Sequence, residues 1–160
     1  MIDCLAPPRR PSRVRPFIEV MPQRQSVLPL DRPVVLIVDD EACVRDVLRL
    51  GLEREGFEVL LAASSWEALG IYDRRWPEID AVVLDLCMPG VTGPQALRCM
   101  RHINPEVRAC FMSGGMYSDA ERRLAEVGSV RVLWKPFPLD EIAQAIREVL
   151  REKEVMSATA

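Results

Sequence analysis

Two kinds of apolar pattern alternate along the chain from Pro33 onward. Short apolar runs rich in β-branched residues predict strands that are buried on both faces. These runs span residues 34–38, 57–62, 79–85, 107–112 and 130–134. Apolar residues at helical spacing predict amphipathic helices within residues 39–57, 65–75, 94–103, 118–128 and 138–153. Strands that alternate with helices in this way indicate an α/β fold, with a parallel sheet covered on both faces.

Several residues mark the expected helix ends. Ser64 and Ser65, followed by Glu67, are typical of the start of a helix. Pro94 suits the first turn of the next helix, because that position needs no backbone N–H donor. Gly56 supplies a C-terminal stop for the helix within residues 39–57.

The composition changes at about residue 33. Seven of the 13 prolines lie in the first 33 residues, and residues 1–32 carry six Arg against three acidic residues. Because proline blocks helix interiors and sheet ladders, we expect a basic, disordered or extended arm over residues 1–32. The domain would span residues 33–152, and residues 153–160 would form a flexible tail. The arm is either a solvated tail, a docking arm for a partner or nucleic acid, or an artefact of a true start at Met21.

The overall composition excludes several classes of protein. A hydrophobic fraction of 49% and a charged fraction of 28% are typical of a globular protein. The formal net charge of -3 gives no attraction to nucleic acid or to anionic membranes, so we expect neither as a partner. There is no apolar stretch of the roughly 20 residues that span a bilayer, and no apolar signal segment. The five cysteines form no C-x-x-C pair, so we expect reduced thiols and a cytoplasmic location.

Residues with chemically active side chains follow the predicted strands. Asp39 and Asp40 follow the first strand, Asp85 ends the third, Ser113 follows the fourth and Lys135 follows the fifth. Because the carboxyl ends of parallel strands meet at one edge of the sheet, these side chains should converge there. Clustered carboxylates repel one another unless a hard cation lies among them, and Mg2+ prefers such oxygen ligands.

This set of residues favours phosphoryl chemistry. A carboxylate beside bound Mg2+ can attack a phosphoryl group and form an aspartyl phosphate. Lys135, the hydroxyl of Ser113 and the backbone N–H groups of the Ser-Gly-Gly turn could then bind the phosphoryl oxygens. Gly114 and Gly115 leave room for the phosphodonor or for an attacking water molecule.

Four segments carry a resemblance to a known family. In chain order, "VVLIVDDE", "VVLDLCMPGVTG", "FMSGG" and "VLWKPF" resemble the receiver domain of bacterial two-component response regulators, over residues 33 to about 152. The resemblance implies a flavodoxin-like (βα)5 fold with strand order 2-1-3-4-5. Because little follows the last helix, we expect a stand-alone receiver.

The resemblance also implies roles for single residues. Asp85 would be the phosphoacceptor, Ser113 the switch hydroxyl and Lys135 the phosphate-binding lysine. Asp40, Asp85 and the backbone carbonyl of Cys87 would form the direct Mg2+ shell, with Asp39 at the outer acidic position. The phosphodonor would be a sensor histidine kinase or a phosphotransfer protein. A downstream protein would bind the face formed by the fourth helix, fifth strand and fifth helix.

One position departs from the family pattern and leaves an alternative open. Receiver domains commonly place an aromatic residue three positions before the lysine, where this chain has Val132, and the nearest aromatic is Trp134. A phospho-independent interaction module with the same fold is therefore the alternative function. A phosphatase of the haloacid dehalogenase type would need an aspartate where Cys87 stands. Without a nucleotide-binding glycine motif either, we expect a phosphoacceptor protein, not an enzyme.

Overall fold

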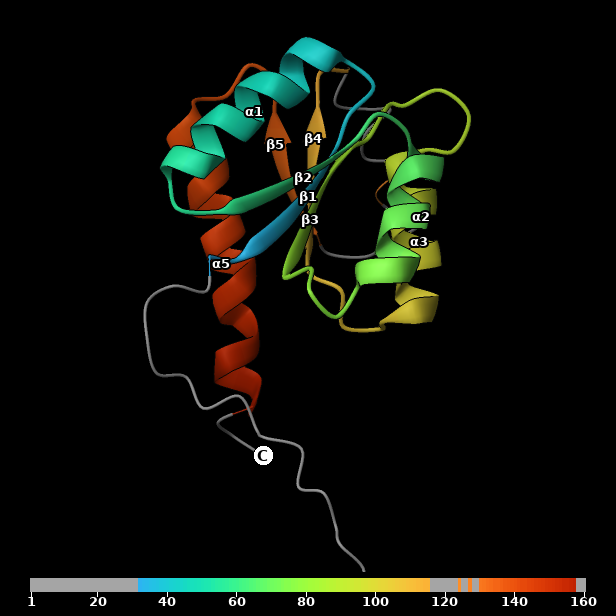
Figure 1. The fold of residues 1–160 in the computed structure, drawn as a ribbon, viewed down its shortest axis with the longest axis vertical. Coiled ribbons are helices and arrows are strands. Elements are labelled where there is room, and N and C mark those ends of the chain that lie inside the picture. The colour runs from blue at the N-terminus through green and yellow to red at the C-terminus, as the bar shows by residue number, and fades with distance from the viewer. Residues whose placement is uncertain (1–31, 116–123, 125–126, 128–129, 158–160) are drawn as a thin grey trace, which may run out of the picture.

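A computed structural model describes residues 32–115, 124, 127 and 130–157 (Figure 1). The strands are β1 (Val34–Val38), β2 (Glu58–Ala62), β3 (Ala81–Asp85), β4 (Ala109–Ser113) and β5 (Arg131–Trp134). The helices are α1 (Ala42–Arg54), α2 (Ser65–Arg75), α3 (Gly93–Ile103) and α5 (Leu139–Ser157). The helix expected over 118–128 lies outside the described residues, apart from Leu124 and Val127.

The strands form one parallel sheet in the order β2-β1-β3-β4-β5. This confirms the flavodoxin-like fold and the strand order expected from the sequence. β3 lies at the centre of the sheet, and all five of its residues are buried. The strand that ends in Asp85 is therefore the one most constrained by its neighbours.

Helices cover both faces of the sheet, with α1 and α5 on one side and α2 and α3 on the other (Figure 1). Each face has its own apolar core. The α1 and α5 side buries Leu48, Leu52, Ile142 and Ile146 against Val35, Ile37, Val83 and Met112. The α2 and α3 side buries Ala68, Tyr72, Leu97 and Met100 against Leu36, Val82, Leu84 and Phe111. Burial on both faces explains why these strands are continuous apolar runs in the sequence.

The helix ends largely match their sequence signals. The hydroxyl of Ser64 accepts a hydrogen bond from the backbone N–H of Glu67 (3.2 Å), and the Glu67 carboxylate accepts one from Ala63 N–H (2.7 Å). Gly56 has a positive φ of 90° directly after α1, where it ends the helix as expected. None of the helices in the described ranges has the length and apolar character that a bilayer span requires.

The last helix is longer than expected. α5 continues to Ser157, past the domain boundary placed at residue 152. Residues 151–156 are "REKEVM", which contains good helix formers and no glycine or proline to end the helix. The boundaries of the arm, domain and tail stay predictions.

Candidate functional site

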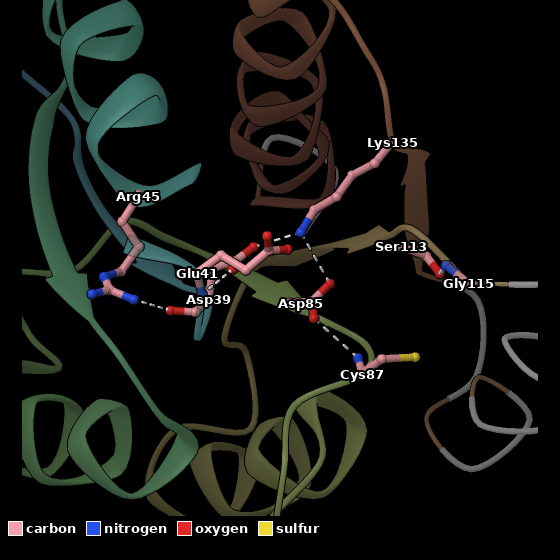
Figure 2. Close-up of polar contacts among 8 residues, drawn as sticks. All are labelled: Asp39, Glu41, Arg45, Asp85, Cys87, Ser113, Gly115 and Lys135. Carbon is pink, nitrogen blue, oxygen red and sulfur yellow. Dashed lines mark hydrogen bonds and ion pairs between the residues drawn. The ribbon is translucent and has the colours of Figure 1, made fainter. Parts of the chain in front are cut away.

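The carboxyl edge of the sheet brings together residues from four strands (Figure 2). The ammonium of Lys135 lies between two carboxylates: its Nζ is 2.6 Å from Oδ2 of Asp39 and 3.5 Å from Oδ1 of Asp85. The backbone N–H of Lys135 also donates to the carbonyl of Ser113 (2.7 Å). This bond fixes the residue after β5 against the end of β4. Of the five residues predicted to converge, the structure brings Asp39, Asp85, Ser113 and Lys135 together, whereas no contact among the described residues joins the exposed carboxylate of Asp40 to them.

Asp39 is completely buried, and its carboxylate has two partners. Oδ1 accepts a hydrogen bond from the backbone N–H of Glu41 (2.9 Å), and Oδ2 accepts one from Lys135. Asp39 therefore forms a local turn before α1, whose N-cap position is Glu41. The next residue, Asp40, is exposed in the bend that follows β1.

Asp85 ends the central strand, and its carboxylate makes two long contacts with described residues. Its Oδ2 accepts a hydrogen bond from the backbone N–H of Cys87 at 3.3 Å, while Oδ1 faces Lys135. Burial raises the pKa of Asp85, and the negative charge of Asp39 raises it further, against the opposing effect of Lys135 and of the Cys87 N–H. The charged form of Asp85 is therefore stabilised less in the fold than in water.

Lys135 shows the complementary behaviour. Burial alone would lower its pKa, but the hydrogen bond to Asp39 and the charges of Asp85 and Asp39 outweigh burial, so the pKa is raised. The lysine stays charged, and its single positive charge forms ion pairs with two carboxylates. The site therefore keeps an excess of negative charge.

Replacing Asp85 with asparagine should raise the free energy of unfolding at neutral pH. The raised pKa of Asp85 means that its protonated form favours folding below its unfolded pKa, and this contribution is lost as pH rises through the folded pKa. The variant should thus match wild type in acid and exceed it increasingly toward neutral pH. Urea midpoints from about pH 4 to about pH 8 test this. The exposed Asp73→Asn is the control, and an equal gain there would contradict the burial effect.

Ser113 is buried at the end of β4, and its hydroxyl accepts a hydrogen bond from the backbone N–H of Gly115 (3.3 Å). A Cβ atom at position 115 would lie 3.6 Å from Sγ of Cys87 and 3.9 Å from Oγ of Ser113. A side chain larger than that of alanine at position 115 would therefore extend from a point next to both of these groups. This arrangement fits the expectation that glycine at this turn leaves room beside the phosphoacceptor.

Two residues that contact the backbone of Asp39 or Asp85 were not identified from the sequence. The Nη1 group of Arg45 on α1 donates to the backbone carbonyl of Asp39 at 2.7 Å (Figure 2). Gly93, the first residue of α3, packs against the backbone of Asp85, and a Cβ atom there would lie 2.3 Å from the Asp85 carbonyl oxygen. The glycine of the "VTG" segment was the only available signal for Gly93, and Arg45 had none.

The donor set at this edge has the chemistry that Mg2+ prefers. The carboxylates of Asp39, Asp40 and Asp85 and the backbone carbonyl of Cys87 are all hard oxygen donors, and the site carries excess negative charge. Within the part of the chain that the structure describes, no three His, Cys, Asp or Glu side chains are gathered in the arrangement of a metal cluster. The ammonium of Lys135 lies between Asp39 and Asp85 instead. The metal ligands therefore stay a prediction that the donor chemistry fits.

Val132 stands at the position where the family commonly has an aromatic residue. It is partly buried on β5, pairs in register with Phe111 of β4 and packs against the core on the α2 and α3 side. Trp134 is 36% exposed and pairs in register with Ser113. The aromatic residue nearest to the lysine in sequence is thus on the edge strand β5, paired in register with Ser113, the predicted switch residue.

Comparison with known proteins decides the family. The family model described as response regulator receiver domain matches residues 35–147. The chain belongs to the response regulator receiver family. The segments matched include Asp39, Asp85, Ser113 and Lys135, all of which lie at the site described above.

Receiver-containing proteins of several kinds are similar in sequence. Sporulation initiation phosphotransferase F of Bacillus subtilis is 33% identical over 116 residues, which are 72% of this chain and 92% of that protein. The sensor kinase CckA of Brucella abortus is 36% identical over 120 residues, 75% of this chain but only 13% of the kinase. The chain spans about half the length of the transcriptional regulators it matches, such as PrrA of Mycobacterium tuberculosis (51%).

Solved receiver structures share the fold. A response regulator receiver domain protein from Clostridium thermocellum superposes with a TM-score of 0.71 at 29% identity, covering 78% of this chain and 98% of that one. A chain of the CheX-CheY-BeF3-Mg+2 complex from Borrelia burgdorferi gives 0.65 at 28% identity, covering 73% and 88%. The protein is therefore a receiver domain of two-component signalling. Receiver domains are generally phosphoacceptors that bind Mg2+ and interact with histidine kinases and downstream targets.

Proposed function

We propose that this receiver is a phosphorylation switch in which Asp85 accepts a phosphoryl group in a Mg2+-dependent reaction. The donor is the phosphohistidine of a sensor histidine kinase or phosphotransfer protein. One observation carries the proposal: the Asp85 carboxylate lies at the end of the central strand, where its contacts with described residues are 3.3 Å and 3.5 Å long and the second of them is to a lysine ammonium. Such a carboxylate can move toward an electrophile while its charge stays balanced.

The transfer step balances without a further reactant. An Oδ atom of Asp85 attacks the phosphorus atom, the bond from phosphorus to the donor imidazole nitrogen breaks, and that nitrogen keeps the electron pair. The phosphoryl group adds negative charge to a site that already carries an excess. Lys135 is close enough to turn its ammonium from Asp39 and Asp85 toward the phosphoryl oxygens, and Ser113 supplies a hydroxyl donor.

The predicted metal ligands take a defined part in this proposal. Asp40, Asp85 and the carbonyl of Cys87 would hold Mg2+ directly, with Asp39 at the outer position. The bound ion would neutralise charge on the phosphoryl oxygens as they approach the carboxylates. The chain thereby assists its own phosphorylation and the later hydrolysis without being an enzyme that acts on a separate substrate.

The test is the intact mass of the protein after incubation with acetyl phosphate and Mg2+. We expect a shift of one phosphoryl group in the wild type and no shift in Asp85→Asn or without metal. Asp73→Asn, which removes an exposed carboxylate from α2, should be phosphorylated like wild type. A shift that persists in Asp85→Asn would show a different acceptor. No shift in a folded wild type that binds Mg2+ would favour the phospho-independent module.

The proposal also includes an output face. Phosphorylation would shift the conformation of the face that includes β5 and α5, toward a state that binds a downstream protein. That face also includes the helix expected over 118–128. Val132 at the usual aromatic position is the one feature that favours the phospho-independent alternative, and family membership does not favour it. The cytoplasmic location expected from the sequence stays part of this proposal.

A further inference from the structure

The backbone carbonyl of Asp39 accepts a hydrogen bond from a charged side chain. Arg45 lies in the second turn of α1, and its backbone N–H donates to the Glu41 carbonyl (3.2 Å), as in an ordinary helix. Its side chain turns back, and Nη1 donates to the Asp39 carbonyl at 2.7 Å (Figure 2). A charged donor makes a stronger hydrogen bond than a neutral one, so this contact restrains the carbonyl firmly.

We infer that Arg45 is a positioning residue that orients the Asp39–Asp40 pair and thereby sets the affinity of the site for Mg2+. The inference deepens the proposed function and rests on it. The Asp39 carbonyl belongs to the peptide unit that joins Asp39 to Asp40, and a peptide unit is planar. A hydrogen bond to its oxygen therefore fixes the orientation of the peptide plane that leads into Asp40.

The other polar groups of Asp39 are already fixed by different partners. Its N–H donates to the carbonyl of Ala62 (3.2 Å), and its carboxylate is held by Glu41 N–H and by Lys135. Within the part of the chain that the structure describes, the carbonyl oxygen of Asp39 is held by Arg45 alone. Among the described residues no hydrogen bond holds the exposed carboxylate of Asp40, so its direction relative to Asp85 depends on the backbone that carries it, which includes this peptide plane.

The charge of Arg45 would act in the opposite direction to its positioning role. A cation near the start of a helix interacts unfavourably with the helix dipole, and a cation near a metal site repels Mg2+. If charge were the main effect, neutralising Arg45 would tighten Mg2+ binding. If positioning is the main effect, neutralising Arg45 will weaken it. The sign of the change therefore separates the two roles.

The experiment compares Arg45→Gln with Arg49→Gln by calorimetric titration of Mg2+ into the unphosphorylated full chain. Arg49 lies one turn further along α1 and forms an exposed ion pair with Glu53 (3.6 Å), so the two variants lose the same charge. We expect the Mg2+ Kd to rise about tenfold in Arg45→Gln, as is usual for loss of a residue that orients metal ligands. In Arg49→Gln it should be unchanged or slightly lower. An unchanged or lower Kd in Arg45→Gln would overturn the inference.

A second variant and a second readout complete the test. Arg45→Lys keeps the charge but presents a single ammonium on a more flexible chain, so Kd should rise by a smaller factor. If Arg45→Gln does not fold, the Kd of Arg45→Lys is the test, and a value equal to that of wild type would overturn the inference. In the acetyl phosphate reaction, the half-saturating Mg2+ concentration should rise by the same factor as Kd, with the rate at saturating Mg2+ nearly unchanged.

The outcomes for the two proposals are distinguishable. If the wild type binds Mg2+ but is not phosphorylated, the proposed function fails while the Kd comparison still judges Arg45. If the wild type is phosphorylated and the two Arg variants have equal Kd values, the function stands and the role of Arg45 is refuted. A wild type that binds no Mg2+ would overturn both.

Discussion

Replacing Lys135 with methionine should lower the free energy of unfolding by about 3–5 kcal/mol at neutral pH, the usual cost of removing one partner of a buried ion pair. Asp39 is completely buried, and its Oδ2 would lose the ammonium 2.6 Å away. Asp85 would lose the positive charge that opposes its desolvation. Methionine preserves most of the apolar volume, so the loss reports on charge more than on packing.

Urea denaturation of wild type and Lys135→Met, monitored by circular dichroism, measures this cost. Arg131→Met is the matched control: it removes one cation of β5 from an exposed pair with Glu148, and should cost no more than about 1 kcal/mol. Adding Asp39→Asn to Lys135→Met should recover a large part of the loss, because the buried charge is removed with its partner. A Lys135→Met cost equal to that of Arg131→Met would show that Asp39 needs no cation.

The same variant has a signature in its pH dependence and in its chemistry. The pKa of Lys135 is raised above that of a lysine in the unfolded chain, so its contribution to folding is complete below the unfolded pKa and is lost as pH rises through the folded pKa. In acid, Asp85 takes up a proton, and the difference between wild type and variant should shrink. Phosphorylation by acetyl phosphate should slow by about 100–1,000-fold, the usual cost of losing one charge-stabilising donor.

The fold and the core of the site could be predicted because both depend on the order of strands and helices along the chain. Once five apolar runs are assigned to a parallel sheet, the residues after each run must share one edge, and Asp85 and Lys135 are brought together by topology alone. The length of α5 was harder to predict, because a helix without a stop signal ends where packing and solvent decide.

The supporting contacts could not be predicted, because they depend on side-chain paths and on packing between elements. Nothing in the spacing of Arg45 distinguishes it from Arg49, yet one bonds to the Asp39 carbonyl and the other to Glu53. Equally, the sequence placed three carboxylates near one another but did not indicate that Lys135 contacts Asp39 more closely than Asp85. Which partner a side chain contacts depends on differences of a few ångströms in the positions of neighbouring elements, which the sequence pattern does not specify.

The contact between Gly93 and Asp85 leads to the second large effect. Gly93→Ala should lower the free energy of unfolding by about 2–4 kcal/mol, because overpacking against a rigid neighbour cannot be relieved by a side-chain rotation. The new Cβ would lie 2.3 Å from the Asp85 carbonyl oxygen and 3.2 Å from the ring of Phe111, whereas Cβ atoms essentially never approach within 3.0 Å. The start of α3 or the end of β3 must therefore move.

Gly70→Ala in α2 is the matched control for this substitution, since it adds the same methyl group to a helix. A Cβ at position 70 would meet only the end of the Arg74 side chain, at 3.8 Å. That variant should gain about 0.5–1 kcal/mol from the better helix propensity of alanine, so the two changes have opposite signs in urea denaturation. Because the clash falls on the backbone of Asp85, the proposed phosphoacceptor, folded Gly93→Ala should also react more slowly with acetyl phosphate, while Gly70→Ala keeps the wild-type rate. Equal stability of Gly93→Ala and wild type would mean that α3 can move away from Asp85 at little cost, and the position of Asp85 would then not depend on this contact.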